Sequence, residues 1–168
     1  MTTKGYKDIL RIGNQSRPNL FDLSVTKPGM LYEKVLEVDE RVLLATEFQV
    51  DGLEVRTGTS GEKIQVSKAP GEPTLIVKRL ELIIDLEEVR RDLQSLYDDG
   101  LRSLSVAFLH SYTFPDHEAA VGELALEIGF SHVSLSSRLS PMVRIVPRGH
   151  SATADAYLTP ELKRYLTG

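Results

Sequence analysis

Apolar residues recur at helical spacing in two segments of the C-terminal half of the chain. In the first segment, Asp85 and Glu88 form a capping-box-like start and Gly100 forms a stop. The apolar face between them consists of Leu86, Val89, Leu93 and Leu96. In the second segment, over 116–128, the inward-facing residues are Ala120, Val121, Leu124, Ala125 and Ile128. The spacing predicts an amphipathic helix in each segment.

Two short apolar runs flank the second of these helices. Residues 101–109 and 132–136 have the length and composition of buried strands. A strand, a helix and a strand make a βαβ unit, and its right-handed crossover makes the strands around Val106 and Val133 parallel. The predicted fold class is therefore α/β, a mixed sheet with a βαβ unit in the C-terminal half and helices packed on the sheet.

The remaining segments show weaker periodicity. Thr3 is expected to cap a short helix over 4–11, and β-branched residues within 31–44 predict one or two strands. The Gly-, Thr- and Ser-rich stretch 46–73 suits hairpins or an exposed excursion. The stretch 148–166 has helical composition, with Pro160 either kinking the helix or opening a second one.

Length and composition indicate one soluble globular domain over 1–168. The chain has 168 residues, of which 41% are hydrophobic and 26% charged, and a net charge of −4. This acidic balance argues against a nucleic-acid or anionic-membrane partner. The absence of cysteine excludes disulfides and thiolate chemistry. Apolar runs fall far short of the roughly 20 residues that cross a bilayer, so a cytoplasmic protein is expected.

The sequence contains no self-contained catalytic signature. Phosphate loops of the Gly-x-x-x-x-Gly-Lys-Ser/Thr type are missing, as are the His-Glu-x-x-His and Gly-x-Ser-x-Gly motifs. The four histidines lack the spacing of a metal motif, so no metal ligand is predicted. His110 follows the strand at 101–109, where ligands of open α/β sheets collect, or it satisfies backbone groups at the turn. His117 is expected on the solvated side of its helix.

Two further segments could bind a carboxylate or an amide. Around the expected start of the last helix lie Arg144, Arg148, His150, Thr153 and Asp155. Arginines at a helix N-terminus suit an anion, although a basic surface segment paired to acidic residues accounts for them equally well. The polar loop of Asn14, Gln15, Ser16 and Arg17 could hydrogen-bond a substrate or form a hydrated turn.

Several stretches, in order along nearly the whole chain, resemble the hydantoinase A family of ATP-dependent 5-oxoprolinases. Near the N-terminus the matching stretches are Thr2-Thr3-Lys4-Gly5, Gly13-Asn14-Gln15-Ser16-Arg17-Pro18 and Val38-Asp39-Glu40-Arg41. Further on they are His110-Ser111-Tyr112, His117-Glu118 and Gly129-Phe130-Ser131-His132-Val133-Ser134. The strongest block runs from Pro141-Met142-Val143-Arg144 through Arg148-Gly149-His150 to Tyr157-Leu158-Thr159-Pro160. The segment 49–80 is matched weakly, and 46–80 is expected to be a variable excursion.

The resemblance implies opening of 5-oxo-L-proline to L-glutamate in glutathione turnover, with ATP, Mg²⁺ and a monovalent cation. It also implies Asp-x-Gly-Gly-Thr nucleotide loops on either side of the matched stretch, and this chain has neither, so no cofactor is expected in it. Met1 falls where the family shows the end of a strand. The chain therefore resembles an internal fragment of the N-terminal hydantoinase A region, inactive alone, whose catalytic residue is unknown.

The expected partners are the remainder of the parent enzyme and 5-oxoproline or a related cyclic amide such as a hydantoin. Whether the chain forms a homodimer is left open. The alternative is a non-catalytic binding or assembly module of a hydantoinase-like enzyme.

Overall fold

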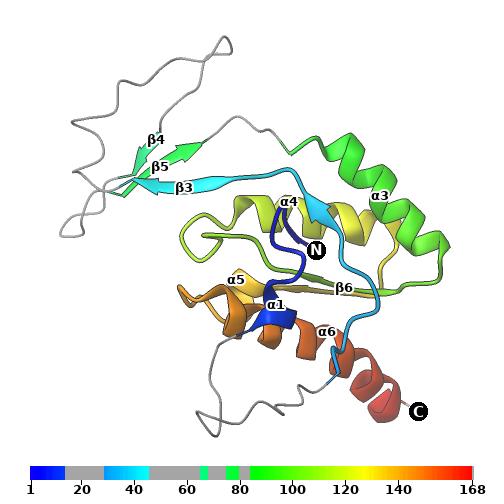
Figure 1. The fold of residues 1–168 in the computed structure, drawn as a ribbon. Coiled ribbons are helices and arrows are strands. Elements are labelled where there is room, and N and C mark those ends of the chain that lie inside the picture. The colour runs from blue at the N-terminus through cyan, green and yellow to red at the C-terminus, as the bar shows by residue number, and fades with distance from the viewer. Residues whose placement is uncertain (14–28, 46–64, 68–74, 80–83, 168) are drawn as a thin grey trace, which may run out of the picture.

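The middle layer of the fold is a set of short parallel strands (Figure 1). The computed structural model describes residues 1–13, 29–45, 65–67, 75–79 and 84–167. Strand β1 (Thr2–Thr3) pairs in parallel with β2 (Glu37–Val38), and β6 (Ser103–Val106) pairs in parallel with β7 (His132–Leu135). A parallel bridge between Thr2 and Ala107 joins the two pairs. The order across this layer is therefore β2, β1, β6, β7.

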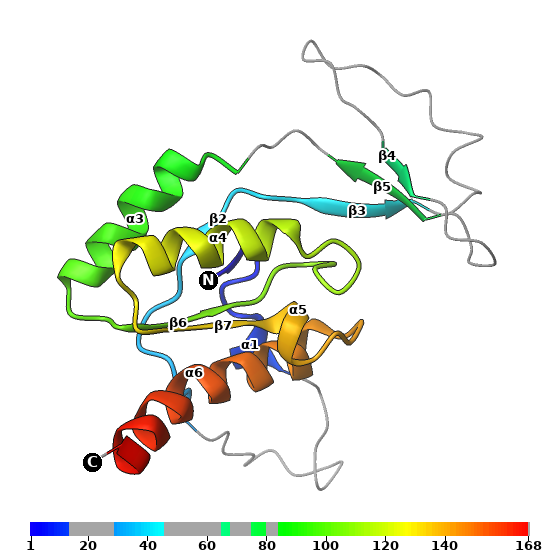
Figure 2. The same cartoon turned by 180° about the vertical axis from the view of Figure 1, so that it is seen from behind.

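Helices cover both faces of the parallel strands (Figure 2). Helices α3 (Leu86–Asp98) and α4 (Asp116–Ile128) lie on one face, and α5 (Ser136–Leu139) and α6 (Ile145–Thr167) lie on the other. The short helix α1 (Ile9–Ile12) lies beside the first part of α6. The core beneath α3 and α4 includes the buried side chains of Leu93, Val106, Phe108, Val121 and Ala125.

A separate antiparallel sheet extends to one side of these layers in Figure 1. It contains β3 (Val42–Ala45), β4 (Gln65–Ser67) and β5 (Leu75–Arg79), with β5 in the middle. Leu44 and Gln65 both pair with Val77, one from each side. Strands were predicted within 31–44, and hairpins were one reading of 46–73. The rest of the expected excursion lies outside the described residues.

The C-terminal βαβ unit is confirmed. The predicted parallel pairing brings Leu104 opposite Val133 and Val106 opposite Leu135, with α4 as the crossover helix. Helix α3 begins as predicted, since the Asp85 carboxylate accepts hydrogen bonds from two backbone N–H groups of the first turn. One predicted core position differs, because Leu86 remains 43% exposed at the start of α3.

The helix predicted over 4–11 is wrong in both extent and cap. Thr3 lies in strand β1, the chain turns at Gly5 with a φ of 88°, and α1 covers Ile9–Ile12 alone. The Thr3 hydroxyl does not cap a helix, because it bonds to the Glu40 carboxylate and to the Leu109 backbone. Contacts with strands distant in sequence therefore override the local helical preference.

The C-terminal segment forms one helix, with Pro160 inside it. Helix α6 begins at Ile145, before the expected start near residue 148, so Arg148 lies in its first turn. Within the described part of the chain, no helix is long and apolar enough to cross a bilayer.

Candidate functional site

Polar side chains meet at the carboxyl ends of the parallel strands, the edge at which open α/β sheets bind ligands. They form two buried clusters with a histidine turn beside them. The Arg148 cluster is defined by Ser111, Glu118, Ser136 and Arg148. The Glu40 cluster is defined by Thr3, Glu40 and His117.

Arg148 is fully buried and joins the ends of two strands to α6. Its Nη2 donates to the Phe108 carbonyl at 2.7 Å, and its Nη1 donates to Ser136 Oγ at 2.5 Å and to Ser111 Oγ. Burial lowers the pKa of the guanidinium, and the nearby Glu118 carboxylate opposes that shift. Arg148 therefore holds the loop after β6 and the residue after β7 in one fixed arrangement.

Glu118 completes the Arg148 cluster from the first turn of α4. Its Oε1 accepts hydrogen bonds from the Phe108 N–H at 2.9 Å and Ser136 Oγ at 2.6 Å, and lies 3.4 Å from Arg148 Nη1. Its Oε2 accepts from the Ser137 N–H at 2.8 Å. A buried carboxylate with these donors is compensated on both oxygens, as a buried ion pair requires.

The Glu40 cluster links the carboxyl end of β1 to α4. Thr3 Oγ1 donates to Glu40 Oε1 and accepts from the Leu109 N–H at 3.0 Å. His117 Nδ1 lies 2.9 Å from Glu40 Oε2, with the His117 side chain 12% exposed. The expectation of a solvated His117 is therefore wrong, because its imidazole packs inward against the buried Glu40 carboxylate, which needs a polar partner.

His110 occupies the turn between the two clusters and β6. Its φ of 56° is in the left-handed region, which costs a non-glycine residue about 1–2 kcal/mol. Its Nδ1 is buried and has no hydrogen-bond partner among the described residues. Burial and the positive charges of Arg148 and Arg41 lower the pKa of the ring, while Glu40 opposes this. The lowered pKa favours the neutral ring, whose buried Nδ1 lacks a protein partner among the described residues.

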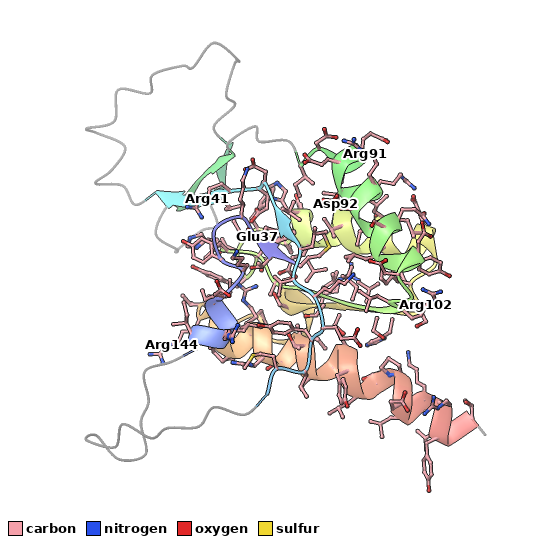
Figure 3. The ribbon with its side chains drawn as sticks, turned by 45° about the vertical axis from the view of Figure 1, so that its right-hand side comes forward. Glu37, Arg41, Arg91, Asp92, Arg102 and Arg144 are labelled. Atoms are coloured by element: carbon pink, nitrogen blue, oxygen red, sulfur yellow. The ribbon has the colours of Figure 1, made fainter. Side chains whose placement is uncertain are left out.

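Arg41 is a half-buried cation near this edge. Its guanidinium lies 5.4 Å from the centroid of the Tyr6 ring. Its Nη1 is buried, and within the described residues no acceptor contacts it. Figure 3 shows Arg41 close to the start of β3. At this edge one buried nitrogen of Arg41 and one of His110 therefore lack hydrogen-bond partners among the described residues.

The other residues singled out from the sequence do not gather at one place. Arg144 and His150 are exposed on the α6 side, and Figure 3 shows Arg144 beside α1. Thr153 Oγ1 donates to the Gly149 carbonyl at 2.8 Å within α6. Asn14, Gln15, Ser16 and Arg17 lie outside the described residues. Of the candidates that the structure describes, His110 and Arg148 meet at the carboxyl edge.

Asp155 lies in a third cluster, on the face of α6 that packs against β7. Its Oδ2 lies 2.6 Å from Ser134 Oγ and 2.9 Å from His132 Nε2, and its Oδ1 accepts from Thr159 Oγ1 at 2.7 Å. These hydrogen bonds, that of Ser134 first, lower the pKa of Asp155 to about 2. A catalytic triad needs the histidine between serine and aspartate. Here Ser134 and His132 both bind the same carboxylate oxygen, so the cluster fastens α6 to β7.

Several residues of this edge carry little sequence signal. Glu118 shares the inward face of its helix with Val121 and Ala125, three and seven positions on, so its burial could have been inferred from spacing. Glu40 and Thr3 lie in segments of weak periodicity, and their contact spans 37 positions. Within the described residues, no group of three or more potential metal-ligating side chains is suitable for an ion.

Comparison with known proteins agrees with the resemblance read from the motifs. The profile of the hydantoinase/oxoprolinase N-terminal region matches residues 1–129. The chain is 52% identical to 5-oxoprolinase 1 of Arabidopsis thaliana over 168 residues, and 48% identical to the 5-oxoprolinase of Saccharomyces cerevisiae over 176 residues. Each alignment covers 99% of this chain and 12% of the relative, so the chain spans about an eighth of their length.

A solved structure shares the fold. The crystal structure of ATP-dependent caprolactamase from Pseudomonas jessenii superposes with a TM-score of 0.63 at 17% identity, covering 99% of this chain and 20% of that one. This likeness supports the α/β arrangement. On the family profile and these relatives together, the chain belongs to the hydantoinase/oxoprolinase N-terminal family.

Proposed function

We propose that this chain is a segment of an ATP-dependent 5-oxoprolinase, which opens 5-oxo-L-proline to L-glutamate. One observation carries the proposal: 5-oxoprolinases of a plant and a yeast match 99% of this chain at 52% and 48% identity. Because the chain spans 12% of those relatives, the remainder of the enzyme is its principal partner. Because the proposed reaction consumes ATP, we place the enzyme in the cytoplasm. Because it releases glutamate from oxoproline, we place it in glutathione turnover.

The reaction requires a means of activating a resistant lactam. Transfer of the γ-phosphoryl group to the amide oxygen turns that oxygen into a leaving group, and water then attacks the ring carbon. The C–N bond then breaks as the nitrogen takes a proton, which leaves an acyl phosphate, and a second water molecule releases phosphate and completes the glutamate carboxylate. Mg²⁺ and a monovalent cation would neutralise phosphate charge in the parent enzyme. The nucleotide and the cations belong to its other segments, and this chain contributes donors and acceptors for the cyclic amide.

His110 is the proposed substrate contact in this chain. A neutral imidazole with a free nitrogen can accept from the ring N–H or donate to the ring carbonyl, according to its tautomer. Arg148 has a different role, because its terminal nitrogens are held by protein groups. It is a positioning residue, which fixes the turn that carries His110. The Asn14 to Arg17 loop remains a proposed second contact.

A chimera tests this assignment. The chain replaces the matching segment of the Saccharomyces cerevisiae 5-oxoprolinase, and ADP release is followed as 5-oxo-L-proline is varied. His110→Ala is expected to raise KM for 5-oxo-L-proline about tenfold, the effect of losing one hydrogen bond of about 1.4 kcal/mol. Arg138→Ala, an exposed arginine on α5, is the control. An unchanged KM in the His110→Ala chimera would remove His110 from the substrate site.

The second candidate function, an assembly module, rests on the distal half of α6. Leu158, Leu162, Tyr165 and Leu166 are 51%, 57%, 84% and 79% exposed, which is an unusual apolar exposure for the end of a helix. In this role the chain holds other parts of the enzyme together. Leu162→Asp in the chimera separates the functions: loss of assembly with normal KM in the residual enzyme favours a module, and loss of affinity alone favours the substrate site.

A further inference from the structure

The carboxyl edge of the parallel strands brings Arg41 and His110 together, although they lie far apart in the sequence. Arg41 follows the end of β2 and His110 follows the end of β6, and β1 lies between these two strands. The hydroxyl of Thr3, the last residue of β1, donates to the Glu40 carboxylate and accepts from the Leu109 N–H at 3.0 Å. Each of these partners immediately precedes one residue of the pair in the sequence. One hydroxyl therefore holds the segments that carry Arg41 and His110 next to each other.

The guanidinium of Arg41 has no carboxylate partner among the described residues. The carboxylates nearest to it in the sequence are all bound elsewhere: Asp39 pairs with Lys4 at 2.7 Å, Glu37 accepts from the Gly5 N–H at 2.8 Å, and Glu40 accepts from Thr3 and lies 2.9 Å from His117. Arg148, the other arginine of this edge, has its charge balanced by Glu118 at 3.4 Å. Arg41 is therefore the arginine of this edge whose charge remains unbalanced within the described part of the chain.

The contacts of Arg41 leave its N–H groups in need of an oxygen acceptor. Its guanidinium carbon lies 5.4 Å from the centroid of the Tyr6 ring, whose face attracts the cation but offers no oxygen to it. Its Nη1 is buried and lacks a hydrogen-bond partner among the described residues. Burying an N–H without an acceptor is unfavourable, and a ligand that brings an oxygen to it recovers that cost. A carboxylate suits this role, because its two oxygens match the planar fork of a guanidinium.

Arg41 and His110 differ in charge in a way that matches the two polar ends of 5-oxo-L-proline. Burial, together with the charges of Arg148 and Arg41, lowers the pKa of His110 and so favours its neutral form. A neutral imidazole suits the uncharged amide of the ring, and a guanidinium suits the carboxylate. In 5-oxo-L-proline the two carbons bonded to the ring nitrogen carry the carbonyl oxygen and the carboxylate. Neighbouring groups of the ligand therefore correspond to neighbouring residues of the edge.

We propose that Arg41 binds the carboxylate of the cyclic amide, and that it makes the site selective for lactams that carry a carboxylate over neutral lactams of the same ring size. His110 contacts the amide group in both kinds of lactam, so it contributes affinity without this selectivity. The inference rests on the proposed function, because it names the part of 5-oxo-L-proline that Arg41 recognises.

The chimera with the Saccharomyces cerevisiae 5-oxoprolinase tests this role with two ligands of one ring size. KM is measured for 5-oxo-L-proline, and Ki is measured for its neutral amide, 5-oxo-L-prolinamide, as a competitor. Arg41→Ala is expected to raise KM for 5-oxo-L-proline at least about tenfold, the effect of losing a charge-assisted hydrogen bond, and to change Ki for the amide less than about twofold. His110→Ala is expected to weaken both ligands. If the amide binds too weakly for a Ki in every version, KM for ATP replaces it and is expected to stay unchanged in Arg41→Ala.

Two further variants separate carboxylate binding from a structural role. Arg41→Lys keeps the charge without the planar fork, and it is expected to recover part of the affinity for 5-oxo-L-proline alone. Arg138→Ala, on α5, is the control and is expected to change neither ligand. Equal losses for both ligands in Arg41→Ala, or an unchanged KM for 5-oxo-L-proline, would overturn the proposal. A raised KM for ATP alone would also overturn it, because Arg41 would then bind a phosphate. These outcomes arise only in an active chimera, whereas an unsubstituted chimera that forms no glutamate would contradict the proposed function.

Discussion

Removal of the Arg148 side chain tests how the carboxyl edge is held together. Arg148→Ala leaves the Glu118 carboxylate buried at 0% exposure, without its cationic partner. It also leaves the Phe108 carbonyl and the Ser136 hydroxyl without the donors that lie 2.7 and 2.5 Å away. Breaking a buried pair from one side is more damaging than replacing both partners, since an uncompensated charge remains.

The expected loss is large relative to the stability of a domain. Removing one partner of a buried ion pair costs about 3–5 kcal/mol, out of a total free energy of unfolding of about 5–15 kcal/mol. With a urea slope of about 2 kcal/mol/M, the midpoint falls by about 2 M. Replacing both partners, as Arg148→Met with Glu118→Gln, removes both charges and is expected to recover part of this loss.

Urea unfolding followed by far-ultraviolet circular dichroism measures these differences. Arg138→Ala, at an exposed position on α5, is the matched control and is expected to change stability by less than about 0.5 kcal/mol. If Arg148→Ala fails to fold, Arg148→Lys provides a milder loss, because it keeps the charge and removes the planar fork. A loss below about 1 kcal/mol in Arg148→Ala, or no recovery in the double variant, would show that the Arg148–Glu118 pair does not hold the carboxyl edge together.

Three further predictions concern Asp155, His110 and Gly149. The pKa of Asp155 is lowered to about 2 from 3.8, so its contribution to folding stability is present above pH 4 and is lost as pH falls toward 2. After discounting for solvent screening, this contribution is about 1 kcal/mol. Asp155→Asn should therefore flatten the pH dependence of the free energy of unfolding in urea between pH 4 and pH 2. Ser134→Ala should shift that loss to higher pH, and an unchanged profile would contradict the assignment of Ser134 as the main cause. Because the φ of His110 is positive, His110→Gly should be about 1 kcal/mol more stable than His110→Ala in thermal unfolding, and equal stabilities would show that the turn relaxes. A Cβ on Gly149 would lie 2.8 Å from Leu10 Cδ2, which is too close for two carbon atoms. Because Leu10→Ala removes this clash, Gly149→Ala should be more favourable for stability in a Leu10→Ala background than alone. Equal effects in the two backgrounds would mean that α1 shifts freely.

Local periodicity was sufficient to predict the elements that are stabilised mainly by residues close to one another in the sequence. The Asp85 cap and the apolar stripe of α3 come from within one helix, and the bounds of α4 follow from its own repeat. The parallel pairing of Val106 with Leu135 follows from the βαβ rule. These parts of the fold could be predicted because each is encoded in a short segment.

The site was predictable only in part, because its bonds span long distances in sequence. His110 could be placed at the carboxyl edge from the end of its strand. Strand β1 could not be predicted, since two threonines form a strand only through β2 and the residues after β6. The pairing of Arg148 with Glu118 spans 30 positions, and no spacing rule connects them. The sequence suggested Arg148 as an anion ligand, and the fold uses its terminal nitrogens to join strand ends.

The most direct test of the proposed function is product analysis of the chimera in which this chain replaces the matching segment of the Saccharomyces cerevisiae 5-oxoprolinase. Glutamate and ADP are measured together after incubation with 5-oxo-L-proline, ATP and Mg²⁺. We expect one glutamate for each ADP released, with a KM for 5-oxo-L-proline close to that of the yeast enzyme. A folded chimera that forms no glutamate, or that releases ADP without forming glutamate, would contradict the claim that this chain is an oxoprolinase segment.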